Sequence, residues 1–366
     1  MEEMENLALK YKLKLLTYRN SIFLFTPEQF KSRQKNYAEE LEQSKHWQAS
    51  ITEATTTTEE DGFFMKEAFL NDVIQYAAKS AQLNYFHNSE LSSAQYTVTG
   101  YFFQSEAPIQ NLEALALAYG LKVIIIRDTI YVFTLSQYSL REDLIKTQLE
   151  QSKHWQASKN STATAKKDEG FFIRDAQIND VIQFLAKSAQ LNYFHNPELS
   201  STKYYVTGHL SDDTSFVRNI EALALAYGLK MIIIRDTVYV FTLSQYALRE
   251  DLIKTQLKQS KHWQPSKNST ATTKEDDGFF ITKANLNEVA QFIAVSENLS
   301  YQQNPELNAR RYQVTGHLLS TTPPLHKIEG FALIHNLRVK RIKDRIHIFT
   351  AQQFASRERD AKKQNQ

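Results

Sequence analysis

The chain has 366 residues, with 43 Lys and Arg against 41 Asp and Glu, a formal net charge of +2 and 42% hydrophobic residues. This near-balance of charge argues against a dedicated nucleic-acid binder, because such proteins usually carry a strongly basic face. The sequence contains no Cys, which excludes disulfide bonds and thiolate metal sites. No apolar run approaches the roughly 20 residues that a membrane-spanning helix needs.

One stretch of sequence recurs along the chain. GFFMKEAFLNDVIQYAAKSAQLNYF begins at Gly62, GFFIRDAQINDVIQFLAKSAQLNYF at Gly170 and GFFITKANLNEVAQFIAVSENLSYQ at Gly278, an interval of 108 residues each time. A fixed period of this kind predicts tandem domains. Residues 4–26 align with 112–134 at the same interval, so we expect them to be the back half of a unit whose upstream sequence is lacking.

Each copy predicts the same order of elements. In copy one a short strand at 63–65 precedes a helix with Leu70, Val73 and Ala77 on one face, followed by two strands rich in aromatic and β-branched residues. A second helix at 112–119 and two closing strands complete the unit. The order β-α-β-β-α-β-β predicts an α+β domain of about 70 residues, with two helices between small sheets.

Polar residues and glycines at equivalent positions predict the ends of these elements. Asn71, Asn179 and Asn287 precede the first helix's apolar stripe and are expected to be its N-caps. A residue suited to a left-handed cap follows the second helix in each copy: Gly120, Gly228 and Asn336. The glycines at 100, 208 and 316 follow strand-like residues, so we interpret them as strand-end or bulge glycines.

The composition between copies predicts amphipathic helical arms and polar linkers. The expected organisation is a truncated repeat half at 1–30, an arm and linker at 31–61, domain 1 at 62–135, an arm and linker at 136–169, domain 2 at 170–243, an arm and linker at 244–277, domain 3 at 278–351 and a polar tail at 352–366.

The closing strands suggest a protein-interaction surface. Residues 123–126 and 231–234 are apolar on both strand faces, whereas copy three has Lys340 and Arg341 there, as expected of a terminal unit in a stacked array. We expect the inner copies to bury the second face against an arm helix or a neighbouring copy. The candidate interaction residues are Ile125, Tyr131, Phe133, Ile233, Tyr239, Phe241, Arg341, Trp155 and Trp263.

Motifs for catalysis or cofactor binding are missing from the sequence. No glycine-rich phosphate loop occurs, and no His pair shows the i, i+4 spacing of a helical zinc site. We therefore predict no enzyme activity, no metal, no cofactor and no small-molecule substrate. A basic cluster near residues 338–345 leaves nucleic-acid binding as an alternative, although a capped sheet face explains the cluster equally well.

The sequence of copy two resembles the short N-terminal domain shared by secretins and TonB-dependent receptors. The resemblance runs through Phe172, Asp175-Ala176, Asp180-Val181-Ile182, Asn192, Pro197, Val206-Thr207 and Glu221-Ala222-Leu223. It covers about 70 of every 108 residues, and one unit recurs where secretins continue with differently patterned modules.

This resemblance implies a periplasmic, outer-membrane-associated protein that contacts other copies of itself or the components of type II, type III or type IV pilus machinery. A signalling segment of a TonB-dependent receptor-like protein is the alternative within the same resemblance. The two readings share one expectation, which is recognition of another polypeptide without chemistry.

Overall fold

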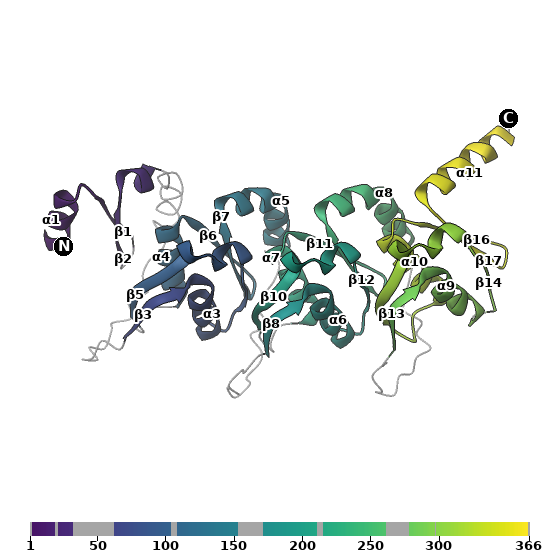
Figure 1. Cartoon of the computed structure of the whole chain (residues 1–366), viewed down its shortest axis with the longest axis horizontal. Coiled ribbons are helices and arrows are strands. Elements are labelled where there is room, and N and C mark those ends of the chain that lie inside the picture. Colours follow the sequence, from purple (N-terminus) through teal and green to yellow (C-terminus); the bar gives the residue numbers. More distant parts are fainter. Residues whose placement is uncertain are drawn as a thin grey trace. The chain divides into compact units, whose positions relative to one another are not determined.

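The computed structural model describes residues 2–18, 21–31, 62–103, 108–152, 171–210, 215–260, 278–296 and 298–364. It confirms the α+β class, since helices alternate with small sheets (Figure 1). The chain divides into two compact units. Unit 1 is Met1–Ile173 with Thr207–Asp213, and unit 2 is Arg174–Val206 with Thr214–Gln366.

Unit 1 contains a helix and a hairpin from the half repeat, followed by copy one. The half repeat consists of α1 (Glu2–Lys10), β1 (Lys14–Tyr18) and β2 (Ser21–Phe25), and β1 pairs antiparallel with β2. The elements of copy one and its arm are β3 (Gly62–Phe69), α3 (Leu70–Ser80), β4 (Asn84–Phe86), β5 (Thr97–Phe103), α4 (Pro108–Tyr119), β6 (Leu121–Ile126), β7 (Thr129–Thr134) and the arm helix α5 (Leu135–Ser152).

Copies two and three show the same order of elements. Copy two comprises β8 (Phe171–Gln177), α6 (Ile178–Ser188), β9 (Asn192–Phe194), β10 (Tyr205–Leu210), α7 (Phe216–Ala226), β11 (Leu229–Ile234), β12 (Thr237–Thr242) and the arm helix α8 (Leu243–Ser260). Copy three comprises β13 (Phe279–Asn285), α9 (Leu286–Val295), β14 (Ser300–Gln302), β15 (Gln313–Leu318), α10 (Pro324–Ile334), β16 (Arg338–Ile342), β17 (Arg345–Phe349) and α11 (Ala351–Gln364).

The first helix of each copy forms because its apolar residues recur at helical spacing. In α6 the residues Ile178, Val181, Ile182 and Leu185 are buried, so one face of the helix joins the core. The second helix ends where the sequence predicts. Gly120 and Gly228 have a φ of 66° and Asn336 has a φ of 56°, in the left-handed region that these residues tolerate best.

The predicted N-caps are wrong by two residues. The N-cap positions are occupied by Phe69, Gln177 and Asn285, and the predicted asparagines lie inside the first turn. Asn179 is fully buried, and its amide bonds groups 14 to 21 residues away instead of the helix's own N–H groups. A tertiary network therefore uses the side chain that the local pattern assigned to capping.

Strands from consecutive copies share sheets. One five-stranded sheet has the order β6-β7-β4-β10-β8, and the other has the order β11-β12-β9-β15-β13. Each contains three strands of one copy and two of the next copy. In the described part of the chain, β3 and β5 form a two-stranded sheet, and β14, β17 and β16 form a three-stranded one.

The arm helices lie on the closing hairpins. Helix α5 contacts β6 and β7, and α8 contacts β11 and β12. Ile125 and Ile232 are partly buried against the cores of their units. The arm helices thus pack against the closing strands of their own copies. These are the strands that are apolar on both faces and were expected to have a cover. Among the described helices, none has the length and apolar content that a membrane span requires.

The core of unit 2 contains residues of two copies. Phe194 and Phe241 of copy two belong to the same buried cluster as Leu286 and Phe331 of copy three. Unit 1 has a separate core around Leu70, Ile74 and Val132, and a small cluster in which Phe23 and Phe25 pack with Leu117 of α4. Burial of apolar side chains across copies stabilises these joins.

Candidate protein interface

The residues predicted as an interaction surface occupy three kinds of environment. Tyr131, Phe133, Tyr239 and Phe241 are buried, Ile125 and Ile233 are partly buried, and Arg341 is exposed. Trp155 and Trp263 lie outside the described residues. That the candidate residues bind another polypeptide stays a prediction. Within the chain, Tyr239 and Phe241 belong to a buried core that also contains residues of copy three.

The buried aromatic residues form a stacked pair that recurs on each closing strand. The ring pairs are Phe23–Phe25, Tyr131–Phe133, Tyr239–Phe241 and His347–Phe349, with ring centroids 5.8, 5.9, 6.1 and 5.8 Å apart. Alternate residues of a strand share one face, which places both rings on the same side of the sheet. Each closing strand therefore presents an aromatic platform.

In unit 2, copy three adds β15, and beyond it β13, to the sheet of copy two. β15 runs antiparallel to β9, with Gly316 opposite Phe194 and His317 opposite Tyr193. The backbone N–H of His195 donates to the carbonyl oxygen of Thr315 at 2.8 Å. This is strand addition, in which main-chain hydrogen bonds join two modules.

Unit 1 contains the equivalent strand pairing. Gly208 lies opposite Phe86 and His209 lies opposite Tyr85, and the N–H of His87 donates to the carbonyl oxygen of Thr207 at 2.8 Å. We call these two pairings the strand junctions.

The glycines of the strand junctions lie within strands, so interpreting them as strand-end or bulge residues was wrong. A Cβ at Gly316 would lie 2.4 Å from the carbonyl oxygen of Tyr193, and one at Gly208 would lie 2.5 Å from that of Tyr85. Only a residue without a side chain permits this approach of two backbones. A register shift occurs instead where β13 pairs with β15, between Ile281 and Ala284 of β13.

Helix α10 of copy three packs on the ring pair of copy two. A Cβ at Gly330 would lie 2.5 Å from the Phe194 ring and 3.3 Å from the Tyr239 hydroxyl. Phe331 meets Phe194 edge to face, with centroids 5.8 Å apart. The helix lies close against the sheet because Gly330 leaves room for the aromatic rings.

Two arginines of copy two hold α10 at its sides and its end. Arg235 forms an ion pair with Glu329 at 2.5 Å, with both side chains largely buried. Arg249 donates to the carbonyl oxygens of Leu333 at 3.1 Å and Ile334 at 2.9 Å. The Leu333 carbonyl oxygen also accepts from the Asn336 N–H at 3.1 Å. The guanidinium therefore adds a second donor at the end of the helix, and its charge complements the helix dipole.

Asn192 connects the loop before α10 to the closing hairpin of copy two. Its Oδ1 accepts from the N–H of Leu319 at 2.6 Å, and its Nδ2 donates to the Thr322 hydroxyl at 2.7 Å. Thr322 in turn donates to a carboxylate oxygen of Asp236. Because Asn192 and Thr322 are buried, these bonds require the two copies to meet in one register.

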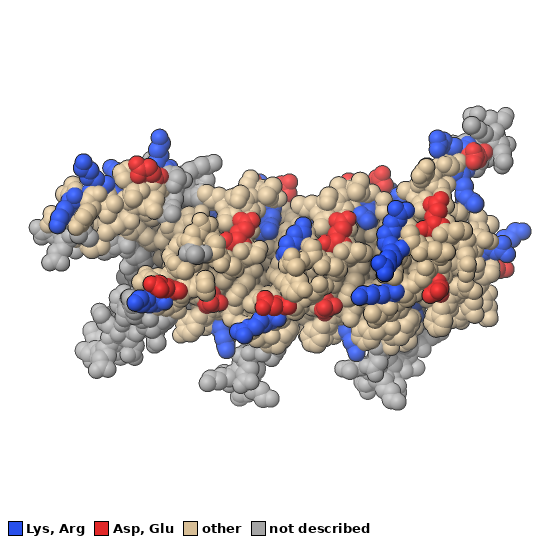
Figure 2. All heavy atoms as spheres, viewed as in Figure 1, with Lys and Arg blue, Asp and Glu red and all other residues tan. Residues whose placement is uncertain are grey.

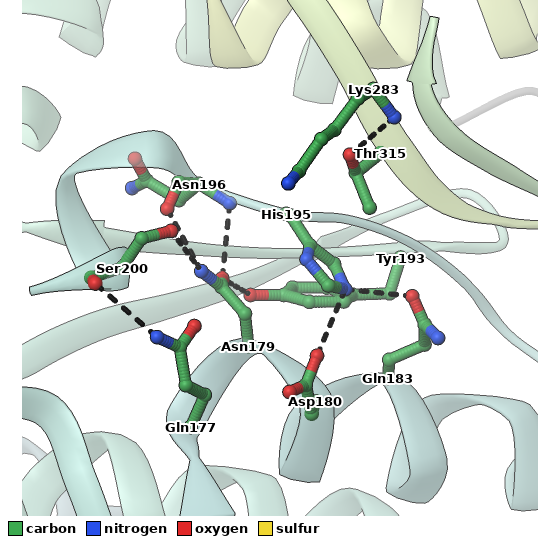
Figure 3. A network of polar contacts seen from close by, with 10 residues as sticks. All are labelled: Gln177, Asn179, Asp180, Gln183, Tyr193, His195, Asn196, Ser200, Lys283 and Thr315. Atoms are coloured by element: carbon green, nitrogen blue, oxygen red, sulfur yellow. Dashed lines mark hydrogen bonds and ion pairs between the residues drawn. The ribbon is translucent and has the colours of Figure 1, made fainter.

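A polar network fixes the strand that accepts the addition (Figure 3). The Oδ1 of Asn179 accepts from the Tyr193 hydroxyl at 2.8 Å and the Asn196 N–H at 3.1 Å, and its Nδ2 donates to the Asn196 carbonyl oxygen at 3.0 Å. Asn196 also donates to the carbonyl oxygen of Val240 at 2.9 Å. The network thus connects α6, β9 and β12, and it recurs around Asn71 and Asn287.

His195 stands beside the network but has contacts typical of a structural residue. Its Nε2 lies 2.7 Å from Gln183 Oε1 and 3.9 Å from an Asp180 oxygen (Figure 3). Burial lowers the pKa of His195, and the Asp180 carboxylate opposes this shift. Among the described residues, no group of three or more His, Asp or Glu side chains is placed to hold a metal ion.

Two features of the sequence indicate this interface, although local patterns of residues did not predict it. Gly208 and Gly316 recur at the repeat interval inside otherwise β-branched strands, and the network asparagines recur with Tyr85, Tyr193 and Tyr301. A comparison with protein-family models finds no match, and a comparison with curated proteins finds no similar sequence. The family resemblance therefore stays a prediction.

We predict that the end of α10 makes the protein's stability dependent on pH. Burial, aided by the Arg249 guanidinium, lowers the pKa of His335 to about 4. The folded state therefore favours the neutral ring. Its contribution should be fully present above the unfolded pKa of 6.5 and should be lost as the pH falls from 6.5 towards about 4. The imidazole is partly accessible, so we expect a loss of about 2 kcal/mol.

His335→Tyr is the matched variant, because Tyr119 and Tyr227 occupy this position in the other copies and donate to a strand carbonyl there. Urea unfolding at pH 7 and pH 4 should show a smaller decrease in stability for the variant than for the unmodified chain. An equal decrease in both proteins would contradict the prediction.

Proposed function

We propose that this chain is a non-enzymatic assembly protein whose α+β modules bind polypeptides by strand addition and helix docking. The observation that carries the proposal is the pair of strand junctions, in which an edge strand accepts the strand of another module. The same backbone chemistry accepts a strand from any partner, and neighbouring side-chain positions select it.

The mixed surface also favours protein partners. Acidic and basic side chains are interspersed on the face drawn in Figure 2. Nucleic-acid binders usually gather basic residues on one face. We further propose, from the resemblance of copy two to secretin N-terminal domains, that the partners belong to an outer-membrane machine and that the protein works in the periplasm.

The test is the state of the protein in the cells that encode it. A chain tagged after Gln366 should fractionate with the outer membrane and sediment, after mild solubilisation, as a complex several times heavier than the 42.4 kDa of the chain. Cross-linking followed by peptide mapping should place partner contacts at strand edges. A free monomer in the soluble cytoplasmic fraction would overturn the proposal.

A further inference from the structure

Copy three carries a cavity at the place where copy two holds α10. The cavity has a volume of about 660 Å³ and lies between β14, β17 and the first turns of α11. Its lining includes Gln302, His347, Phe349 and Arg357. At the repeat interval, Gln302, His347 and Arg357 correspond to Phe194, Tyr239 and Arg249 of copy two, which contact α10. Phe349 corresponds to Phe241, which lies in the same buried cluster as Phe331 of α10. Within the described chain, β14 is also the outermost strand of its sheet.

Compared with copy two, the lining of the cavity retains the arginine that holds the end of a helix. Phe349 and Arg357 repeat Phe241 and Arg249, and the Arg357 guanidinium stands 4.5 Å from the Phe349 ring centroid. Arg357 is exposed. The lining thus retains an arginine for the carbonyl oxygens at a helix end.

The apolar contacts are replaced at the positions that meet the middle of α10. Phe194 and Tyr239 have the counterparts Gln302 and His347 in copy three. A helix that enters this cavity needs a polar residue where α10 has Gly330, because buried polar groups require hydrogen-bond partners.

Helix α1 has the residues that this cavity requires. It aligns with α10 at the repeat interval, so that Glu5, Asn6 and Leu9 take the places of Glu329, Gly330 and Leu333. The polar residue Asn6 therefore takes the place of Gly330, which faces Phe194 and Tyr239 in copy two, and copy three has Gln302 and His347 at those two positions. Glu5 and Asn6 are exposed, and Leu9 is 77% exposed.

The chain itself shows that a helix docks on a ring pair without an added strand. Leu117 of α4, the counterpart of Leu9, is 6% exposed and packs with the ring pair of Phe23 and Phe25. In the described chain, β5 of that copy pairs only with β3. Leu9 is therefore exposed, whereas its counterpart Leu117 is buried against a ring pair. The ring pair that lines the cavity is His347–Phe349.

We propose that a second copy of this chain inserts its α1 into the cavity, so that molecules associate head to tail. Leu9 packs on Phe349, Asn6 meets Gln302 and His347, and Glu5 pairs with Lys343, the counterpart of Arg235. Arg357 donates to the carbonyl oxygens at the end of α1, as Arg249 does to Leu333 and Ile334. The inference rests on the proposed function and names its partner.

The charges of α1 and of the hairpin beside the cavity are complementary. Residues 2–9 contain three Glu and no Lys or Arg, whereas residues 338–345 contain five basic residues and one acidic residue, Asp344. The charged residues of the lining itself are Glu306 and Arg357. Lys10, at the end of α1, stands over the ring of its own Tyr11, 5.3 Å from the centroid. Charge complementarity of this kind speeds encounter and fixes register, so the association should weaken with added salt. A head-to-tail interface joins further copies into rings or open chains.

Sedimentation velocity over about two decades of concentration tests the inference on the purified full chain. We expect the unmodified chain to form dimers and larger species. Leu9→Asp and Arg357→Glu should each raise the dissociation constant about tenfold or more. Both sites are exposed, so circular dichroism should show intact folding. Leu248→Asp, at a leucine that is 73% exposed on α8, is the matched control and should associate like the unmodified chain.

Mixing the two defective variants identifies the head-to-tail arrangement. Leu9→Asp keeps an intact cavity and Arg357→Glu keeps an intact α1, so their mixture should form one-to-one dimers and nothing larger. A monomeric unmodified chain at every concentration, a mixture without dimers, or equal effects of Leu9→Asp and Leu248→Asp would each overturn the inference. Large complexes in cells together with a monomeric purified chain would refute self-association and leave the proposed function standing.

Discussion

Replacing Gly316 by alanine is expected to separate β15 from β9 and to destabilise unit 2 by about 3 kcal/mol. The added Cβ would lie 2.4 Å from the Tyr193 carbonyl oxygen and 3.0 Å from the Phe194 Cα, both backbone atoms that cannot rotate away. The strand must retreat, which breaks the bond from the His195 N–H to Thr315 and exposes the Phe194 ring. Urea unfolding and hydrogen exchange at residues 192–196 measure the two effects.

Gln313→Ala provides the control for this experiment. Gln313 lies on the same strand but is exposed, so its replacement should change stability by less than about 0.5 kcal/mol. Gly208→Ala should reproduce the large effect at the other strand junction, where the Cβ would lie 2.5 Å from the Tyr85 carbonyl oxygen. If Gly316→Ala were as stable as Gln313→Ala, the close approach of the strands would be disproved.

Replacing Asn179 by leucine should cost about 4 kcal/mol, because the change leaves several buried polar groups without partners. The Tyr193 hydroxyl and the Asn196 N–H would lose their acceptor, and the Asn196 carbonyl oxygen would lose a donor. Leucine has a similar volume, so the loss reports on hydrogen bonds and not on a cavity. Because the chain has several units, unfolding should be followed by hydrogen exchange at β9 as well as by urea titration.

Ser200→Ala is the milder test of the same network. Ser200 accepts one bond from Asn179 at 3.2 Å and is exposed, so its loss should cost no more than about 1 kcal/mol. A large loss for Asn179→Leu and a small one for Ser200→Ala would show that the buried bonds to β9 and Asn196 dominate. Equal, small losses would show that the network contributes little.

The sequence predicted the α+β class and the order of elements because both depend on local patterns. Helical spacing of apolar residues sufficed for α6, and the left-handed preference of Gly and Asn sufficed for the ends at Gly120, Gly228 and Asn336. The N-cap error at Asn179 has an equally physical cause. An asparagine side chain can form hydrogen bonds with nearby or with distant backbone groups. A local pattern does not show that the Asn179 amide bonds a carbonyl oxygen 17 residues away.

Sharing of strands between copies could not be predicted from one sequence of repeats. β10 and β15 have nearly the same residues, so each is compatible with its own copy and with the preceding one. The cavity in copy three could not be predicted for the same reason. Gln302 and His347 point to a binding site only once the structure shows that their counterparts, Phe194 and Tyr239, contact α10.

The central claim is that an edge strand of one module accepts the strand of another, and hydrogen exchange of the unmodified chain tests it most directly. Residues 84–88, 192–196 and 300–304 occupy the same place in copies one, two and three, so each serves as a control for the others. In dilute solution the first two segments should exchange slowly, since β10 and β15 cover them, and the third should exchange much faster at β14. Equal, fast exchange of all three would contradict strand addition.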